Sequence, residues 1–130
     1  MALLSDESIE TRNRAAYSLV RWDWPDMQKQ FQSMTQSEDL RRAGCASFIL
    51  AKYYDQKLNG DVLDRYLESE LNYLVGPPYA GTDNVVAIIQ VLGQQGTRSS
   101  LSVLEKATTH RHRLVREASE KAVLQISSKK

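Results

Sequence analysis

The sequence Asp-Asn-Val-Val-Ala-Ile-Ile-Gln-Val-Leu-Gly-Gln-Gln-Gly at residues 83–96 decides the fold class. Between Val85 and Leu92 only Gln90 is polar. This run is far shorter than the roughly 20 residues that a membrane-spanning helix needs. A helix that is apolar on nearly every side lies between other elements of a folded domain. Gly93 and Gly96 end the run, so we predict a helix in the middle of a helical stack.

The composition is that of one soluble globular domain. The chain has 130 residues, of which 42% are hydrophobic and 25% are charged, which is sufficient for a single buried core. We expect this domain to cover residues 1–127 and a frayed basic tail to cover residues 128–130. Because 17 basic residues nearly balance 16 acidic ones, the overall charge does not favour nucleic acid or an anionic membrane as a partner.

Two features of the sequence concern the compartment. Cys45 is the only cysteine, so no internal disulfide can form, and this fits a reducing environment. The N-terminal residues contain neither a basic segment nor a long apolar segment, unlike a signal peptide or a membrane anchor. We therefore expect a cytoplasmic protein that does not contact a membrane.

The spacing of apolar residues predicts helices throughout. Proline and glycine cluster between apolar-periodic stretches, and no stretch alternates as a β-strand does. We predict helices at residues 5–22, from Pro25 to about Met34, at 40–54 and at 61–75. An apolar helix from Asp83 would then be stopped by Gly93 and Gly96, and two further helices would follow at 97–108 and 113–127. Ser5 or Asp6 would cap the first of these helices, and Thr97 would cap the sixth. Residues 76–81 contain two prolines and two glycines, which predicts the longest irregular loop.

Four segments share one pattern: residues 11–19, 40–48, 84–92 and 115–123. Each has a small residue at its fourth or fifth place and an apolar residue at its ninth. Arg12, Arg41 and Arg116 stand at the second place in three segments, and Val85 stands there in the other. These places are 29, 44 and 31 residues apart. A unit of about thirty residues holds two short helices with their turns, so the longer step contains an insertion.

The C-terminal part of this pattern resembles HEAT repeats. Leu92-Gly93-Gln94-Gln95-Gly96 matches the Leu-Gly-x-x-Gly turn of that family, and Val115-Arg116-Glu117-Ala118 matches the start of its inner helix. The resemblance is good over residues 83–126, fair over 25–54 and weak between 60 and 82. It implies an all-α, short, right-handed α-solenoid of about seven helices in HEAT-like hairpins. The family often places an acidic residue six before the arginine, which here fits Asp6 and Arg12 alone.

No constellation of catalytic or metal-binding residues stands out. A nucleophilic cysteine needs a positioned base, and no sequence feature pairs Cys45 with His110 or His112, so we expect Cys45 to be a buried packing residue. His110 and His112 lack further ligands nearby, whereas zinc takes three or four. We therefore expect a solvated turn there, with no catalytic residue, no metal and no cofactor.

The candidate partner-binding residues are arginines and aromatics: Arg12, Arg41, Arg42, Arg116, Trp24, Tyr53 and Tyr79. The arginines either hydrogen-bond between repeats or form a basic stripe for an acidic peptide or a phosphate backbone. Trp24 and Tyr53 lie near helix ends, where aromatics often anchor a partner. Tyr79 either packs on the helix at 61–75 or is presented to a partner by the loop at 76–81.

We predict a non-enzymatic protein-binding module: an adaptor, a scaffold or a small bacterial immunity-type binder. It would use the concave face of the inner helices and the loop at 76–81. The alternative is a nucleic-acid-binding HEAT-like protein that uses the arginine stripe. A third hypothesis, from the family resemblance alone, is an accessory subunit of a phycobilin-lyase-like enzyme.

Overall fold

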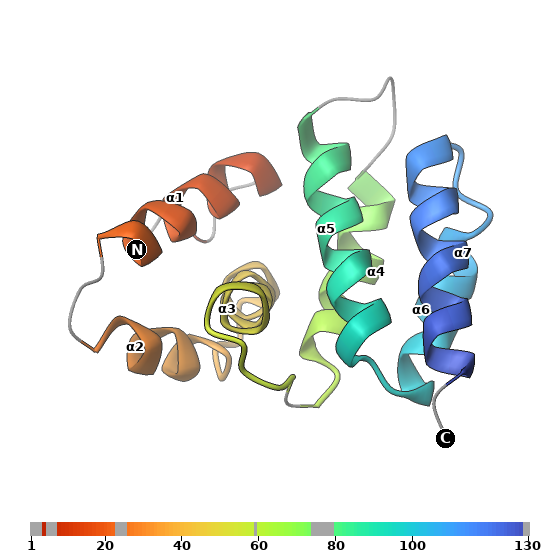
Figure 1. The fold of residues 1–130 in the computed structure, drawn as a ribbon. Coiled ribbons are helices and arrows are strands. Elements are labelled where there is room, and N and C mark those ends of the chain that lie inside the picture. Colours follow the sequence, from red (N-terminus) through yellow and green to blue (C-terminus); the bar gives the residue numbers. More distant parts are fainter. Residues whose placement is uncertain (1–3, 5–7, 23–25, 59, 74–79, 129–130) are drawn as a thin grey trace.

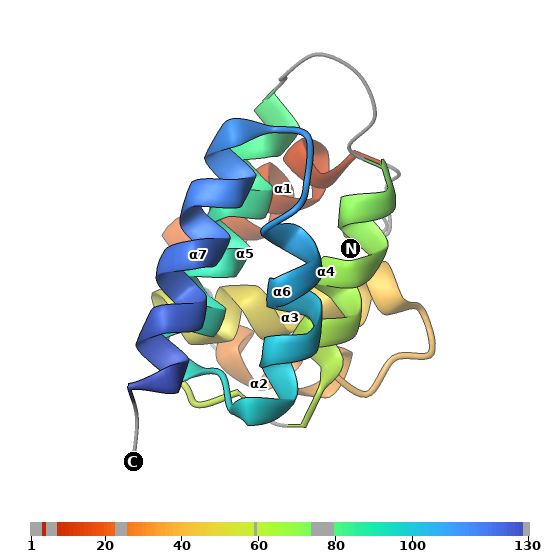
Figure 2. The same cartoon turned by 90° about the vertical axis from the view of Figure 1, so that its right-hand side faces the viewer.

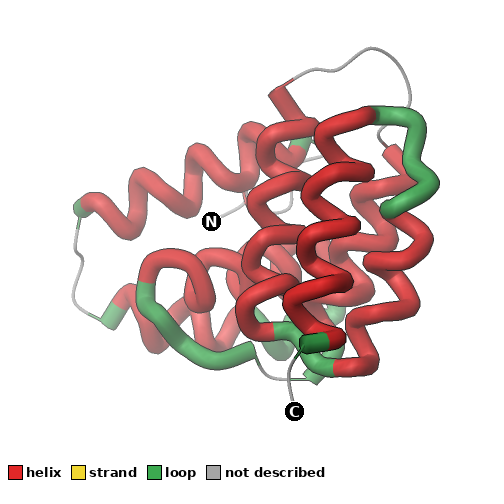
Figure 3. The backbone as a smooth tube through the Cα atoms, turned by 45° about the vertical axis from the view of Figure 1, so that its right-hand side comes forward, coloured by secondary structure: helices red, strands yellow, loops and turns green. Residues whose placement is uncertain are grey.

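The computed structural model describes residues 4, 8–22, 26–58, 60–73 and 80–128 (Figure 1). In this part of the chain every regular element is helical (Figure 3), which confirms the predicted all-α class. The elements are α1 (Ile9–Arg21), α2 (Met27–Met34), α3 (Leu40–Tyr53), α4 (Val62–Tyr73), α5 (Ala80–Gln95), the 3-10 helix η2 (Arg98–Ser100), α6 (Leu101–Ala107) and α7 (Arg113–Ser127). None of these helices has the length and apolar character needed to cross a membrane.

Several helix ends follow from side chains in the sequence. Ser8, rather than the predicted Ser5 or Asp6, caps α1, and its Oγ accepts a hydrogen bond from the backbone N–H of Thr11 at 3.4 Å. Thr97 caps η2 as predicted, since its Oγ1 accepts from the N–H of Ser99 at 3.3 Å. The predicted Ser5 and Asp6, together with Pro25 and the tail residues 129–130, lie outside the described residues.

The prediction of an irregular loop at residues 76–81 is wrong at its end, because α5 begins at Ala80. Alanine is the best helix former, and Asp83 in the first turn interacts favourably with the positive end of the helix dipole. Gly81 is therefore helical despite its low propensity. Residues 76–79 of the predicted loop lie outside the described residues.

Helices α4 to α7 form two layers, with α5 and α7 in one layer and α4 and α6 in the other (Figures 1 and 2). Gly93 of α5 lies against Ala122 of α7, and Gly96 lies against Ile126, so these two helices run in the same direction. In the other layer Lys106 Nζ of α6 donates to Glu68 Oε1 of α4 at 2.6 Å.

Helix α3 lies across these layers and is seen end-on in Figure 1, where α5 and α7 run vertically. It contacts α1, α2, α4 and α5, and residues 43–51 are all buried. The predicted central helix does not stop at Gly93, because α5 continues to Gln95, and it shares the middle of the molecule with α3. The physical reason is the run of small residues in α3, which lets neighbouring helices approach it from several sides. Gly44, for example, lies directly against the ring of Tyr66.

The core joins both central helices. Ile88 and Leu92 of α5 are buried as predicted, and they belong to the same apolar cluster as Phe48 and Ile49 of α3. One continuous core therefore connects α1–α3 with the layered helices.

Candidate functional site

Exposed aromatic side chains gather where α1 and α3 end. The rings of Tyr17 and Tyr53 lie 5.3 Å apart between centroids, tilted by 40°. Tyr17 is 42% exposed and Tyr53 is 40% exposed, and Trp22 at the C-cap of α1 is 65% exposed. We call Tyr17, Arg21, Lys52 and Tyr53 the aromatic–cation cluster.

Two cations of the cluster lie over its rings. The guanidinium carbon of Arg21 is 5.8 Å from the centroid of Tyr17. Lys52 Nζ is 5.5 Å from the centroid of Tyr53 and also 5.5 Å from that of Phe48. Cations at these distances are attracted by the negative face of an aromatic ring. The cluster therefore presents apolar surface and positive charge together.

Local helix geometry and the packing of α1 on α3 explain this arrangement. Tyr17 and Arg21 are one helical turn apart on α1, so their side chains share one face. Cys45 Sγ lies 3.7 Å from the carbonyl oxygen of Arg12 and 3.7 Å from Asn13 Oδ1, whereas Tyr53 meets Tyr17. The two helices cross, since α1 lies lengthwise in Figure 1 while α3 is seen end-on, and the last turn of α3 reaches Tyr17 of α1. Burial, and then the neighbouring Tyr17, raise the pKa of Tyr53.

Arg12 was a candidate for partner binding, but the structure buries it. Its side chain is fully buried, forms an ion pair with Glu70 of α4, and donates from Nε to the hydroxyl of Tyr66 at 3.0 Å. The guanidinium carbon also lies 5.5 Å from the centroid of the Tyr66 ring. A residue enclosed in this way cannot contact a partner on the surface. Burial raises the pKa of Glu70, and the adjacent charge of Arg12 opposes that rise.

The other predicted arginines are half-buried and do not continue an exposed stripe. Arg116 donates from Nη1 to the carbonyl oxygens of His110 at 2.9 Å and Arg111 at 2.8 Å, so it holds the turn before α7. Arg41 and Arg42 lie in the first turn of α3. At Arg12 and Arg116 the structure thus favours the structural interpretation over the binding one.

Of the predicted aromatics, Tyr53 lies in the cluster, and Trp24 and Tyr79 lie outside the described residues. The residues that sequence reasoning missed as site residues are Tyr17, Arg21 and Lys52. The spacing of Tyr17 and Arg21 on one exposed face of α1 was the available signal. Their proximity to Tyr53, however, depends on the packing of α3.

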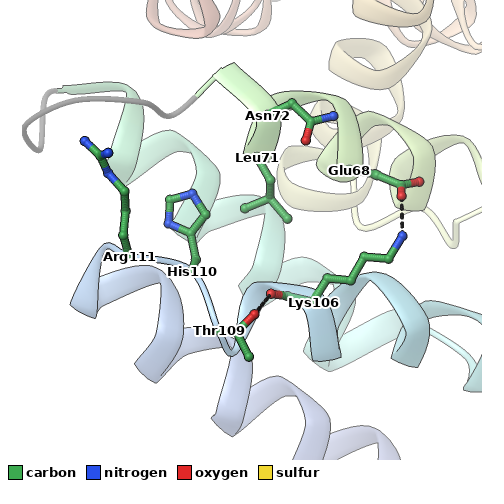
Figure 4. A pocket seen from close by; sticks show the side chains of 7 residues that line it. All are labelled: Glu68, Leu71, Asn72, Lys106, Thr109, His110 and Arg111. Atoms are coloured by element: carbon green, nitrogen blue, oxygen red, sulfur yellow. Dashed lines mark hydrogen bonds and ion pairs between the residues drawn. The ribbon is translucent and has the colours of Figure 1, made fainter.

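The second candidate site is a hollow between α4 and the turn before α7 (Figure 4). It has a volume of about 510 Å³ and is lined by Glu68, Leu71, Asn72, Lys106, Thr109, His110 and Arg111. Several of its polar groups already bind each other: Lys106 pairs with Glu68, and Thr109 Oγ1 donates to the carbonyl oxygen of Lys106 at 2.9 Å. Burial lowers the pKa of His110, so this imidazole is neutral at pH 7. The hollow is therefore a weaker candidate than the cluster.

Cys45, His110 and His112 are the side chains that could act as a nucleophile or as metal ligands. Cys45 is fully buried, as predicted for a packing residue, and burial raises the pKa of its thiol to about 12. His110 and His112 stack with centroids 5.2 Å apart, and His110 Nδ1 accepts from the N–H of His112 at 3.2 Å. Within the described ranges, no group of three or more histidine, cysteine, aspartate or glutamate side chains is placed to hold a metal ion.

Comparison with protein-family models, with curated proteins and with solved structures finds no match to this chain.

Proposed function

We propose that this chain is a HEAT-like helical-repeat protein that binds another protein, as an adaptor, a scaffold or an immunity-type binder. The arrangement of α4–α5 and α6–α7 supports the repeat. Each pair is a helical hairpin, and corresponding helices of the two pairs lie in the same layer. In such a right-handed α-solenoid, α5 and α7 are the inner helices and α4 and α6 the outer ones. Stacked hairpins of this kind offer an extended surface to a partner.

The aromatic–cation cluster carries the proposal of protein binding. Tyrosine, tryptophan and arginine are the residues that dominate binding energy at protein interfaces. The cluster contains Tyr17 and Tyr53, two of the five large hydrophobic side chains that are exposed in the described part of the chain. Tyrosine and tryptophan have few rotatable bonds, so ordering them on binding costs little entropy.

A nucleic-acid partner remains the second candidate, because aromatics next to cations also bind single strands. Base stacking, however, requires an open ring face. Here Arg21 lies over Tyr17, and Lys52 lies over Tyr53. The net charge of +1 supplies no broader basic surface for a phosphate backbone. Both observations favour a protein.

Photo-cross-linking tests this proposal. Tyr53 is replaced by p-benzoylphenylalanine, and the protein is irradiated in an extract of cells that make it. A matched protein carries the same group at Glu120, which is exposed on α7. We expect a discrete protein adduct from position 53 that excess unmodified protein suppresses. The proposal fails if position 53 gives no adduct, if both positions give the same adducts, or if the adduct is digested by nuclease.

A further inference from the structure

We propose that the aromatic–cation cluster binds an acidic segment of its partner, in which aspartate or glutamate alternates with large apolar side chains. This inference rests on the proposed function and adds the chemistry of the ligand. It follows from two cations of the cluster that form no ion pair with a described residue, and from the apolar surface beside them.

Five of the eleven exposed cations in the described part of the chain form an ion pair with a carboxylate. Ion pairs join Arg14 to Glu10 at 2.7 Å, Lys106 to Glu68 at 2.6 Å and Arg113 to Glu117 at 3.2 Å. Similar pairs join Lys29 to Asp26 and Arg65 to Asp61. A cation that is paired in this way has little to gain from a second carboxylate.

Arg21 and Lys52 differ from those cations. Among the described residues neither has a carboxylate within ion-pair distance, and the contacts of each are with aromatic rings. Glu10, on the same side of α1, is already paired with Arg14. Asp55, two residues beyond Tyr53, forms no ion pair with either cation. The cluster thus carries two positive charges whose electrostatic complement is absent from the described surface.

The rings make these charges better receptors for a carboxylate. A guanidinium that lies on an aromatic face has lost part of its freedom and part of its hydration, so less is lost when a carboxylate binds it. Arginine also presents paired N–H donors that match the two oxygens of a carboxylate. Tyr17 connects Arg21 to Tyr53 and hence to Lys52, so two carboxylates on one extended segment would reach both cations.

The apolar part of the ligand is required by the exposed aromatics. The uncovered parts of Tyr17 and Tyr53 gain free energy when apolar side chains remove them from water. A segment with acidic residues alone would leave these surfaces wet. A segment with apolar residues alone would bury Arg21 and Lys52 beside it without partners, which costs free energy.

A random peptide library displayed on phage supplies the probe. Peptides are selected on the immobilised full chain, and those released by free protein are sequenced. Their affinities are then measured by fluorescence anisotropy for the wild type and for the double variant Arg21→Gln/Lys52→Gln. The control is Arg98→Gln/Lys121→Gln, which removes the same charge from exposed residues outside the cluster. The melting temperature is measured in parallel, because cations near helix C-termini also stabilise their helices.

We expect selected peptides rich in aspartate and glutamate, with an affinity about three- to twentyfold lower for the double variant than for the control. Tyr53→Ala should also abolish their binding. If peptides need Tyr53 but are neutral or basic, the acidic chemistry is wrong while the proposed protein-binding function stands. If no selected peptide depends on Tyr17 or Tyr53, the proposed function itself fails. Competition by an oligothymidylate that needs the same two cations would favour nucleic acid instead.

Discussion

At the scale of single residues, the ion pair between Arg12 and Glu70 has the largest structural consequence. It joins α1 to α4, and Tyr66 contributes both its hydroxyl and its ring to Arg12. Removing two charges from water is expensive, so such a pair adds little net stability compared with apolar side chains. Its effect is to fix how α1 docks, because each charge would otherwise be buried without a partner.

Glu70→Gln should therefore destabilise the fold by about 3–5 kcal/mol, since it leaves the buried guanidinium of Arg12 without a counter-charge. Urea unfolding followed by circular dichroism measures this. The double variant Arg12→Met/Glu70→Leu removes both charges and should be more stable than Glu70→Gln. A loss of less than about 1 kcal/mol in the single variant would show that Arg12 is solvated when the protein is in solution.

Cys45 gives a pH dependence at the same scale. Burial raises the pKa of its thiol from 9.0 to about 12, so the folded chain keeps a proton that the unfolded chain releases above pH 9.0. This contribution to stability is complete below pH 9.0 and is lost as the pH rises from 9.0 to about 12.

The free energy of unfolding of the wild type, minus that of Cys45→Ala, should thus decrease with rising pH in this window. The steepest decrease is about 1.4 kcal/mol per pH unit. Urea titrations at several pH values from about 8 to about 10 measure it, and the subtraction removes the titration of tyrosines and lysines. A constant difference would mean that the thiol ionises as readily in the folded chain as in the unfolded one.

At the scale of elements, close approach of α3 and α4 depends on a single glycine. A Cβ added to Gly44 would overlap atoms of the Tyr66 ring, which is itself fully buried and bonded to Arg12. The ring cannot move aside without disturbing Arg12 and Glu70. Gly44 thus sets the spacing of the two helices.

Gly44→Ala should destabilise the fold by about 1–3 kcal/mol, as overpacking does, despite the better helix propensity of alanine. Gly93→Ala is the matched control, because the atom it meets most closely is the end of the Gln125 side chain, which is exposed and can rotate away. Thermal unfolding should show a clearly larger loss at position 44. Equal melting temperatures for the two variants would mean that α3 and α4 separate easily.

At the scale of the whole molecule, one core holds helices α1–α3 and the layered helices α4–α7 together. Leu92 is buried where α5 meets the neighbouring helices, and it shares the core with residues of α3 and α7. The molecule should therefore unfold as a unit, although it consists of hairpin units and a crossing helix.

Leu92→Ala should cost about 2–5 kcal/mol, the range for buried leucines. Leu124→Ala, on the exposed side of α7 with 68% of its surface in water, should cost far less. Chemical unfolding measures both. A cost below about 1 kcal/mol for Leu92 would place the apolar side of α5 on an open surface, and two separate transitions would show that the core is not continuous.

The all-helical class and most helix bounds were determined by the sequence itself. The last helix, Arg113–Ser127, matches its prediction at both ends, and Thr97 caps the preceding helix as expected. Apolar periodicity, caps and helix-breaking residues act over one or two turns, so they can be recognised without a structure. The same local signals placed the start of the first helix wrongly, with Ser5 or Asp6 as its cap in place of Ser8, because several nearby polar residues were suitable caps.

Only the tertiary structure decided which side chains meet. Arg12 was a candidate for partner binding, yet it is buried against Glu70, which lies 58 residues away in the chain. Tyr53 was predicted as a candidate, whereas its neighbours Tyr17 and Arg21 were not. Similarly, α3 can cross the layered helices because its small residues let several neighbouring helices approach closely. These outcomes depend on how helices distant in sequence pack together, and the periodicity of one helix shows which face is apolar but not which partner covers it.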